Sequence, residues 1–177
     1  MSAQAHTSDP ATLDRRTLAR DHRRLAALLR PGMHVLDVGC GTGAITAGIA
    51  QAVAPGGSVV GLDRDATLLD RARTQHAAVS GLRFVEGDVL GLDGPDRFDV
   101  VTAARALQWI DHPDDALARM AAATRPGGWV VVLDYSHADL TWDPEPPQAI
   151  RRFIDCFLAW RTAHGWDSRI ALSLIHI

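Results

Sequence analysis

The chain has 177 residues, of which 47% are apolar and 22% charged, a balance that is typical of one globular domain and excludes a wholly disordered chain. Its formal charge of −3 excludes a strongly basic protein, so we expect neither nucleic acid nor a membrane as a partner. No apolar stretch reaches the roughly 20 residues that span a bilayer, and the first residues lack the order of a signal peptide, so we expect a cytoplasmic location.

Residues 1–32 are predicted to form an N-terminal helical segment. A helix is expected to begin near Pro10, with Ser8 or Asp9 as its N-cap, and to end at the sequence RPG. Four residues share one face of this helix at helical spacing: Leu18, His22, Leu25 and Leu29. The arginines between them, Arg15 to Arg24, are interpreted as a solvated face and not as a binding patch.

Residues 33–135 alternate between strand-like and helix-like segments. Runs rich in valine and leucine predict strands over 34–38, 58–63, 82–88, 98–104 and 127–135. Helices are predicted over 44–54, 65–79 and 113–124. This alternation indicates parallel strands joined by right-handed crossovers, with helices on both faces. The expected fold is therefore α/β, a three-layer, doubly wound, Rossmann-like and mostly parallel sheet.

Residues 136–171 interrupt this rhythm with a proline-bearing loop and one more helix, predicted over 147–164. The loop and helix could form a lid with apolar walls, or the helix could pack on the sheet; we expect packing and leave the loop open. The residues of those walls are Trp142, Phe153, Phe157 and Trp160. The last six residues, 172–177, are similar to a translated sequencing adapter, so we expect a non-native tail on a shortened gene.

Three glycines, Gly39, Gly41 and Gly43, follow the first predicted strand at alternate positions. Glycine permits positive φ and a close approach of ligand to backbone, and a tight turn alone needs one or two, so three favour a ligand site. With Ala44 they also fit the G-x-G-x-x-[G/A] dinucleotide pattern, with an acid about 20 residues further on. A nucleotide-linked oxidoreductase using NAD(P) therefore stays an alternative.

Four motifs, taken together, decide between a dinucleotide and another ligand. The sequence has VLDVGCGTG with Asp37, VVGLDRD with Asp63, EGDV with Asp88, and RPGGWVVVLD at the fifth strand. Together these motifs resemble the class I S-adenosylmethionine-dependent methyltransferases from about Met33 to Tyr135. The resemblance implies a sheet of seven strands, of which this chain supplies five, so the last two are expected to be missing. It also implies that this shortened chain could bind the cofactor poorly.

The resemblance implies S-adenosylmethionine as the cofactor and a role for each motif. The glycine loop would lie against the methionine part, Asp37 would help to fix its amino group, and Asp63 would accept both ribose hydroxyls. Carboxylates suit a cationic cofactor and a vicinal diol. The implied adenine neighbours are Arg64, Asp88 and Val89, and the implied junction with the acceptor is formed by Ala104, Arg105 and Trp109. Each has a structural alternative: a cap or loop acid for the aspartates, and core packing for Trp109.

Methyl transfer from sulfonium is an in-line displacement that depends on alignment and exclusion of water, so no catalytic residue is obligatory. If the acceptor must lose a proton, His137 is the best base candidate, although a loop histidine is more often exposed.

Cys40 is interpreted as a small residue that fills space in the loop. Cys40 and Cys156 are both expected to be reduced thiols, and no metal is expected. The segment after the fourth strand lacks the motifs of base-modifying enzymes, and its ALQW and IDHPDDAL resemble the small-molecule branch of the family. This resemblance implies a small-molecule acceptor that is methylated at O, N or C. A non-catalytic module that only binds S-adenosylmethionine is the other alternative.

Overall fold

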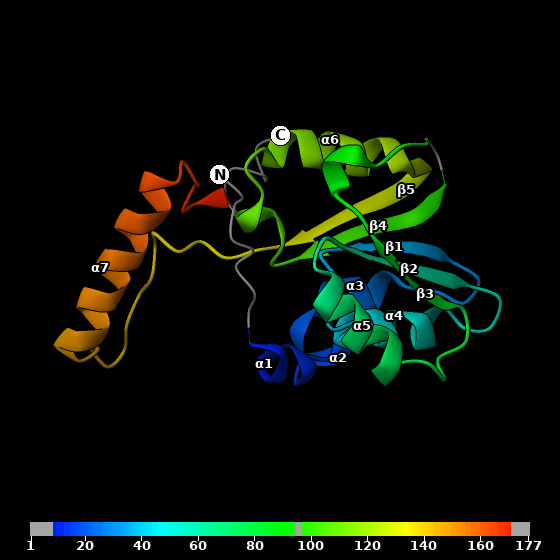
Figure 1. The fold of residues 1–177 in the computed structure, drawn as a ribbon, viewed down its shortest axis with the longest axis horizontal. Helices are drawn as coiled ribbons and strands as arrows, with labels where there is room; N and C mark the ends of the chain where they lie inside the picture. Colours follow the sequence, from blue (N-terminus) through cyan, green and yellow to red (C-terminus); the bar gives the residue numbers. More distant parts are fainter. Residues whose placement is uncertain (1–8, 95–96, 171–177) are drawn as a thin grey trace.

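The computed structural model describes residues 9–94 and 97–170 and contains one five-stranded sheet (Figure 1). The strands are β1 (His34–Val38), β2 (Ser58–Asp63), β3 (Leu82–Glu86), β4 (Phe98–Ala104) and β5 (Thr124–Leu133). Their order is β3-β2-β1-β4-β5, and every neighbouring pair is parallel. The chain order switches beside β1, where β2 lies on one side and β4 on the other. The predicted doubly wound α/β fold is confirmed.

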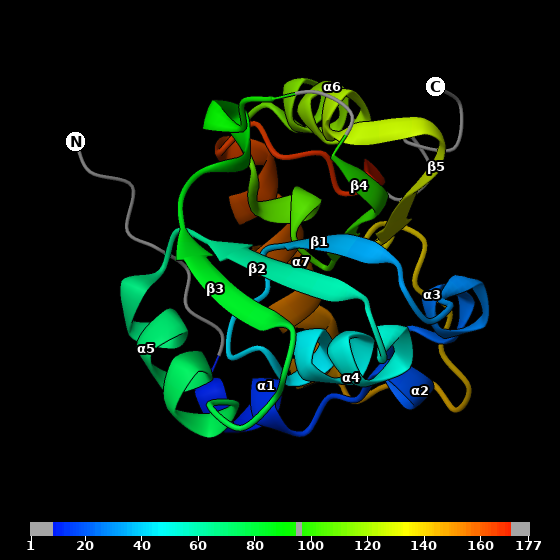
Figure 2. The same ribbon diagram turned by 90° about the vertical axis from the view of Figure 1, so that its right-hand side faces the viewer.

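Helices cover both faces of the sheet (Figure 2). On one face lie α4 (Ala44–Val53) and α5 (Ala66–Gln75), together with the N-terminal helices, and on the other lies α6 (Pro113–Ala123). These three helices agree with the predicted ranges within a few residues at each end. Two short 3₁₀ segments, η1 (Val89–Gly91) and η2 (Leu107–Trp109), follow β3 and β4. The three-layer arrangement is therefore also as predicted.

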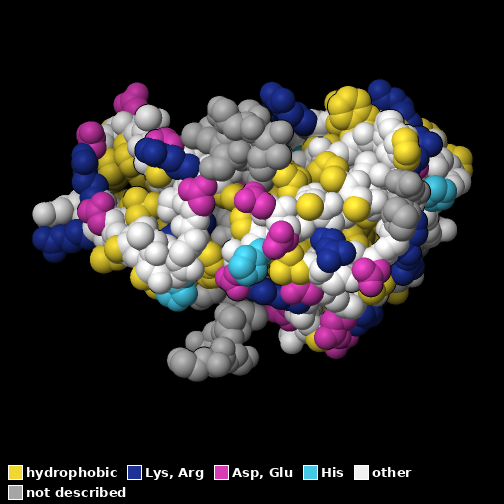
Figure 3. Space-filling model, turned by 90° about the horizontal axis from the view of Figure 1, so that it is seen from above, with side chains coloured by type: hydrophobic (Ala, Val, Ile, Leu, Met, Phe, Trp, Pro, Cys, Tyr) yellow, Lys and Arg dark blue, Asp and Glu magenta, His cyan; other side chains and the backbone are white. Residues whose placement is uncertain are grey.

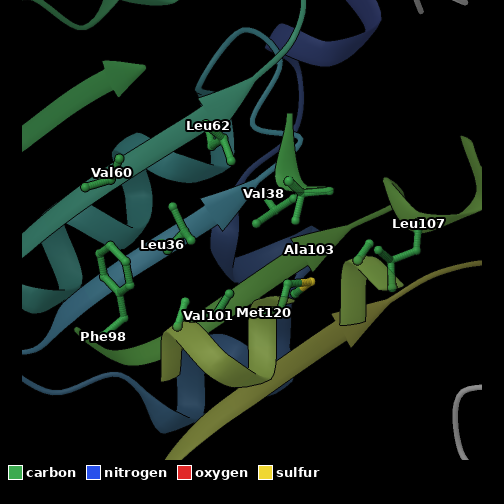
Figure 4. Close-up of a cluster of buried hydrophobic side chains, with 12 residues drawn as sticks. Leu36, Val38, Val60, Leu62, Phe98, Val101, Ala103, Leu107 and Met120 are labelled. Atoms are coloured by element: carbon green, nitrogen blue, oxygen red, sulfur yellow. The ribbon is translucent and has the colours of Figure 1, made fainter. Parts of the chain in front are cut away.

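The core divides at the sheet because successive side chains of a strand point to opposite faces. Leu36 and Val101 belong to the cluster under α6 that Figure 4 shows, where Met120 fills the space between helix and sheet. Their neighbours Val35 and Val100, both fully buried, belong to the cluster under α4. Strands buried on both faces explain why the sequence shows continuous valine and leucine runs here and no alternation with polar residues.

The N-terminal segment is three short helices and not the single helix that was predicted: α1 (Pro10–Asp14), α2 (Leu18–Asp21) and α3 (Arg23–Leu28). Asp9 caps α1 as expected, whereas Ser8 lies outside the described residues. The break before α2 arises because the Thr17 hydroxyl accepts from the Arg20 amide and starts a new helix. The break after α2 comes at His22, whose φ of −146° is extended.

The expected apolar stripe of this segment is nevertheless buried. Leu18, Leu25 and Leu29 are at most 8% exposed and pack in the cluster under α4. His22 is buried too, and its Nε2 lies 3.1 Å from the Thr102 hydroxyl on β4. Burial lowers the pKa of His22 to about 4, so the ring is neutral at physiological pH. The segment therefore turns twice in order to follow the surface of the sheet and α4.

The last helix, α7 (Gln148–Ala163), has the predicted bounds but does not pack on the sheet. Figure 1 shows it beyond the carboxyl ends of the strands, apart from both helical layers. Ile150 and Phe153 on its apolar face are 42% and 64% exposed. The prediction that α7 packs on the sheet is wrong, because an apolar stripe identifies a face without identifying what covers it. The predicted tail, residues 172–177, lies outside the described residues.

The surface carries charges of both signs. On the face in Figure 3, basic and acidic side chains are scattered among one another. Among residues 9–94 and 97–170, no helix combines the length and the apolar character needed to cross a bilayer.

Candidate functional site

A cavity opens where the carboxyl ends of the central strands meet. Val38 of β1 pairs in register with Leu62 of β2 and with Ala103 of β4, so these three strands end at the same level. In doubly wound sheets this edge, beside the switch in strand order, is where ligands bind. Eight of the predicted cofactor residues line the cavity: Asp37, Gly39, Gly41, Asp63, Arg64, Val89, Ala104 and Arg105. Trp109, predicted at the acceptor junction, lines it as well.

The glycine loop after β1 needs all three glycines for its own conformation. Gly39, Gly41 and Gly43 have φ values of +69°, +54° and +75°. A Cβ at Gly39 would lie 2.5 Å from the Cβ of Ala106, and one at Gly43 would lie 2.5 Å from the ring of Phe84. All three φ values lie in the left-handed region that favours glycine, and at Gly39 and Gly43 a Cβ would also clash, so the turn itself accounts for the glycines without a ligand. Gly43 does not line the cavity and begins α4 against β3.

Four of the five amides of the loop over residues 39–43 are already used inside the protein. Four of them donate as follows: Gly39 and Cys40 to the Leu62 carbonyl, Gly41 to an Asp63 carboxylate oxygen, and Gly43 to the Cys40 carbonyl. A pyrophosphate at a glycine-rich turn needs amides that point freely at the ligand. The amides of Gly39, Cys40, Gly41 and Gly43 are therefore not free to bind a pyrophosphate, which favours a ligand without one over NAD(P).

Asp63 ends β2 with its carboxylate directed at the glycine loop. One oxygen accepts from the Gly41 amide at 2.7 Å, and the other accepts from the Asp65 amide at 3.0 Å. Each carboxylate oxygen can accept a second hydrogen bond, so the group is fixed in place and still able to receive two hydroxyls. Asp63 thus joins the first loop to the second and presents an acceptor pair suited to a vicinal diol.

Asp37 is the most deeply buried acid of the cavity, with 3% of its surface exposed. The Thr46 hydroxyl on α4 donates to its carboxylate at 2.7 Å. Burial raises the pKa of Asp37 to about 7, against the lowering effect of the Thr46 hydrogen bond, and the nearby charge of Asp63 raises it further. The side chain accepts from a hydroxyl and not from helix amides, so the alternative of a simple helix cap does not describe it.

Of the two predicted adenine neighbours that follow β3, only one lines the cavity. Val89 is buried and lines the cavity together with Gly87. Asp88, between them, is exposed and accepts from the Leu90 amide at 2.9 Å, which caps η1. Its side chain is absent from the cavity lining, so the geometry brings Val89 but not Asp88 to the predicted adenine position.

Two cavity residues, Leu13 and Arg16, escaped the sequence analysis. They come from α1 and the turn after it, and they line the cavity together with residues of the strand ends. Asp14, also in α1, ties this segment to α5 through Arg71, which forms an ion pair with it, and through Gln75 at 3.2 Å. Nothing in the spacing of the five arginines over residues 15–24 distinguished Arg16. A signal for the turn that carries Arg16 existed only in Thr17, which caps the start of α2.

His137, the base candidate, does not line the cavity. Its Nε2 contacts the Gln108 side-chain oxygen, and its ring packs edge-on against Phe157 at 5.3 Å between centroids. Burial, and secondarily the charge of Arg161, lower its pKa below the ordinary value. The expected apolar walls are absent from the lining as well: Trp142, Phe153, Phe157 and Trp160. Among the described residues no histidine reaches the cavity, so the site has no neutral nitrogen base.

Cys40 lines the cavity but has no nucleophilic character. Burial, together with the charges of Asp37 and Asp63, raises the pKa of its thiol well above the ordinary value. A thiol with a raised pKa stays protonated and unreactive. Cys40 and Cys156 are both free, as predicted.

Comparison with known proteins places this architecture among methyltransferases. The family described as methyltransferase domain matches residues 35–128. A trans-aconitate 2-methyltransferase from Deinococcus radiodurans is 38% identical over 149 residues, which are 81% of this chain and 55% of that protein. A ubiquinone/menaquinone biosynthesis C-methyltransferase from Ectopseudomonas mendocina is 41% identical over 61% of this chain and 44% of that protein. The chain thus spans about half the length of these relatives.

A solved structure confirms the fold over most of the chain. The S-adenosylmethionine-dependent methyltransferase from Aquifex aeolicus superposes with a TM-score of 0.61 and 20% sequence identity. The match covers 81% of this chain and 80% of that one. At this identity the likeness concerns the fold alone.

Proposed function

Because this chain belongs to the class I S-adenosylmethionine-dependent methyltransferases, we propose that its cavity binds S-adenosylmethionine and directs the methyl group to a small-molecule acceptor. One observation carries the proposal: the Asp63 carboxylate, held by the amides of Gly41 and Asp65, faces a cavity whose glycine loop has four of its five amides hydrogen-bonded within the protein. That combination fits a ribose next to a group without phosphates. Asp37, buried beside the loop, suits the ammonium of the same ligand.

The cavity residues fit the remaining parts of the ligand by their chemistry. Leu68 and Val89 are apolar surfaces for a flat adenine ring, with Arg64 beside them in the lining. Ala104 and Ala106 have small side chains and leave room for a ligand at the end of β4. S-adenosylmethionine, when bound, supplies an electrophilic methyl group on a cationic sulfur. The carboxylates of Asp37 and Asp63 would favour the positive charge of the bound cofactor electrostatically.

The chain's own contribution to the reaction is alignment and exclusion of water. Trp109 and Ile110 line the cavity next to Arg105, and they would keep water away from the methyl group. Holding the acceptor and the methyl group in line is the main route to rate acceleration when no proton has to move. We propose no catalytic base, since His137 is directed to Gln108 and lies off the cavity. The acceptor is then a group that is nucleophilic without loss of a proton.

The location and the excluded substrate classes that we propose are based on the composition of the chain. We propose a cytoplasmic enzyme that uses neither nucleic acid nor a membrane as substrate, in line with its formal charge of −3. The methylated atom in this proposal is an O, N or C atom of the small-molecule acceptor.

A calorimetric titration of the chain with S-adenosylmethionine and, separately, with NAD⁺ tests the proposal. We expect binding of the first and none of the second, and we expect Asp63→Asn to weaken S-adenosylmethionine by about tenfold or more, because a charge-assisted acceptor of the ribose is lost. Asp70→Asn, on the exposed side of α5 and off the cavity, is the control for a lost carboxylate. Binding of NAD⁺ in preference to S-adenosylmethionine would overturn the proposal.

A further inference from the structure

Two arginine side chains, Arg16 and Arg105, line the same cavity although they come from distant parts of the chain. Arg105 follows β4 and has a left-handed backbone, with φ +61°, the single positive value among the non-glycine residues described. Its side chain is only 13% exposed. A non-glycine residue in this conformation is strained, and such strain is kept where a side chain must be aimed precisely.

The guanidinium of Arg105 is only partly satisfied by the protein. Its Nε donates to the Tyr135 hydroxyl, and its Nη2 lies 3.8 Å from a carboxylate oxygen of Asp21. The guanidinium carbon lies 5.2 Å from the centroid of the Tyr135 ring. Its Nη1 is buried and has no hydrogen-bond partner among the residues that the structure describes. A buried, charged donor without a partner is costly unless a ligand supplies the acceptor.

Positive charges outnumber negative charges around the Arg105 guanidinium. Burial, and then the charge of Arg105, lower the pKa of Arg16, while Asp21 opposes the effect. Asp21 is also shared, because Arg20 Nε lies 3.0 Å from it and the Thr17 amide donates to it at 2.8 Å. Within the described ranges, no other carboxylate lies within ion-pair distance of Arg16 or Arg105. Three arginines around one aspartate leave an excess of positive charge at the cavity wall.

We propose that Arg16 and Arg105 form an anion subsite that binds a carboxylate of the ligand in this cavity. Guanidinium groups present planar pairs of donors that match the two oxygens of a carboxylate. Nη1 of Arg105 has no partner among the described residues and Arg16 lines the same cavity, so each guanidinium can donate to one oxygen of a carboxylate. The inference rests on the proposed function, in which two ligands offer a carboxylate: the amino-acid part of the cofactor, and an acceptor that is itself a carboxylic acid.

The subsite also connects the N-terminal segment to ligand binding. Arg16 is placed by the turn between α1 and α2, and α1 is tied to α5 through Asp14 and Arg71. A carboxylate held by Arg16 and Arg105 would bridge this segment to the end of β4. The segment would then close one side of the cavity around the ligand.

Calorimetry on the full chain and on Arg16→Gln tests the subsite and separates the two sources. S-adenosylhomocysteine carries the amino-acid carboxylate, whereas 5′-methylthioadenosine has the same nucleoside and sulfur without it. If the carboxylate is the cofactor's, Arg16→Gln weakens S-adenosylhomocysteine by about tenfold or more and changes 5′-methylthioadenosine by less than about twofold. Arg15→Gln, an exposed neighbour that does not line the cavity, is the control for lost charge.

If the carboxylate belongs to the acceptor, the same variant leaves both nucleosides unchanged. Citrate, titrated into the protein saturated with S-adenosylhomocysteine, then binds about tenfold or more weakly to Arg16→Gln, and its neutral trimethyl ester binds to neither protein. Arg105→Gln is the second variant, and a thermal melt of each variant confirms that it is folded. Either pattern supports the subsite.

The proposal is overturned if folded Arg16→Gln and Arg105→Gln bind S-adenosylhomocysteine and citrate as the unchanged chain does. That result leaves the proposed function standing. If the unchanged chain binds no S-adenosylhomocysteine, the proposed function fails instead, and the titration with citrate alone decides the subsite. Citrate binding that is lost in Arg16→Gln supports the subsite, and no citrate binding to the unchanged chain overturns it.

Discussion

At the scale of single residues, Asp37 has the clearest chemical perturbation in the cavity. Its carboxyl is buried, accepts from Thr46 and has its pKa raised from 3.8 to about 7. At neutral pH the group is therefore divided between its neutral and charged forms. A cation bound beside it favours the charged form, which couples ligand binding to the release of a proton.

The affinity for S-adenosylmethionine should depend on pH through Asp37. Below about pH 7 the carboxyl must lose a proton to meet the ammonium, so we expect the affinity to fall by up to about tenfold for each pH unit lower. In Asp37→Asn the affinity should be weaker at pH 8 and nearly independent of pH. Calorimetry in buffers from about pH 6 to pH 8 measures this. A flat profile for the unchanged chain would contradict the role of Asp37.

The raised pKa of Asp37 also affects folding stability, but in the opposite direction: affinity for the cofactor rises with pH, whereas stability falls. Because the folded state holds the proton more tightly than the unfolded state, folding is favoured at low pH, and the contribution is lost as the pH rises from 3.8 to about 7. We therefore expect Asp37→Asn to melt at a higher temperature than the unchanged chain at pH 8, where the buried charge is uncompensated. A lower melting temperature at that pH would show that the charge is compensated in the free protein.

Gly39 tests the steric reading of the glycine loop. A Cβ there would lie 2.5 Å from that of Ala106 in a backbone with φ +69°, so we expect Gly39→Ala to cost about 2 to 4 kcal/mol in the free energy of unfolding. Gly32→Ala is the matched control, because its φ is +88° and nothing lies within 4 Å of its Cβ. Denaturant titrations give both values. The double variant Gly39→Ala with Ala106→Gly should recover part of the loss; no recovery would show that the close contact is not the cause.

At the scale of elements, α7 is attached to the rest of the chain mainly through its carboxyl-terminal half. Arg161 is fully buried there, with its guanidinium carbon 5.5 Å from the Trp109 ring and 5.8 Å from the Phe157 ring. It donates to the carbonyl of Asp167 at 2.9 Å. The amino-terminal half, with Ile150 and Phe153, is exposed. The two halves should therefore contribute very differently to stability.

Two phenylalanines one turn apart measure this difference. Phe157→Ala removes contacts to His137 and Trp160 and should cost about 2 kcal/mol in the free energy of unfolding. Phe153→Ala, at 64% exposure, should cost less than about 0.5 kcal/mol. Denaturant titration followed by circular dichroism provides both numbers. Equal costs would mean that the apolar face of α7 is covered along its whole length.

The elements also show what could be predicted from sequence and what could not. The strands and crossover helices were predictable because valine and leucine runs, closed by glycine and proline, report the backbone state locally. The break at Thr17 has a local signal in its capping hydroxyl, whereas the break at His22 was not predictable, because His22 contacts Thr102, far away in the chain. Arg16 could not be assigned to the cavity for the same reason, whereas Asp37 and Asp63 could, since their motif places them at strand ends.

At the scale of the whole molecule, function depends on the common carboxyl edge of β1, β2 and β4. The sheet order β3-β2-β1-β4-β5 brings four loops to one cavity, and the N-terminal segment adds a fifth wall. Core packing on both faces of the sheet keeps these strand ends in register. The fold thus explains why residues as distant in sequence as Arg16 and Arg105 line the same cavity.

The most direct test of this account is a crystal structure of the chain with S-adenosylhomocysteine. It should show both ribose hydroxyls hydrogen-bonded to Asp63, the adenine beside Val89, and the amino group next to the loop that begins at Gly39. Electron density for the nucleoside at another place in the fold, or an empty cavity in crystals soaked at saturating concentration, would contradict the account.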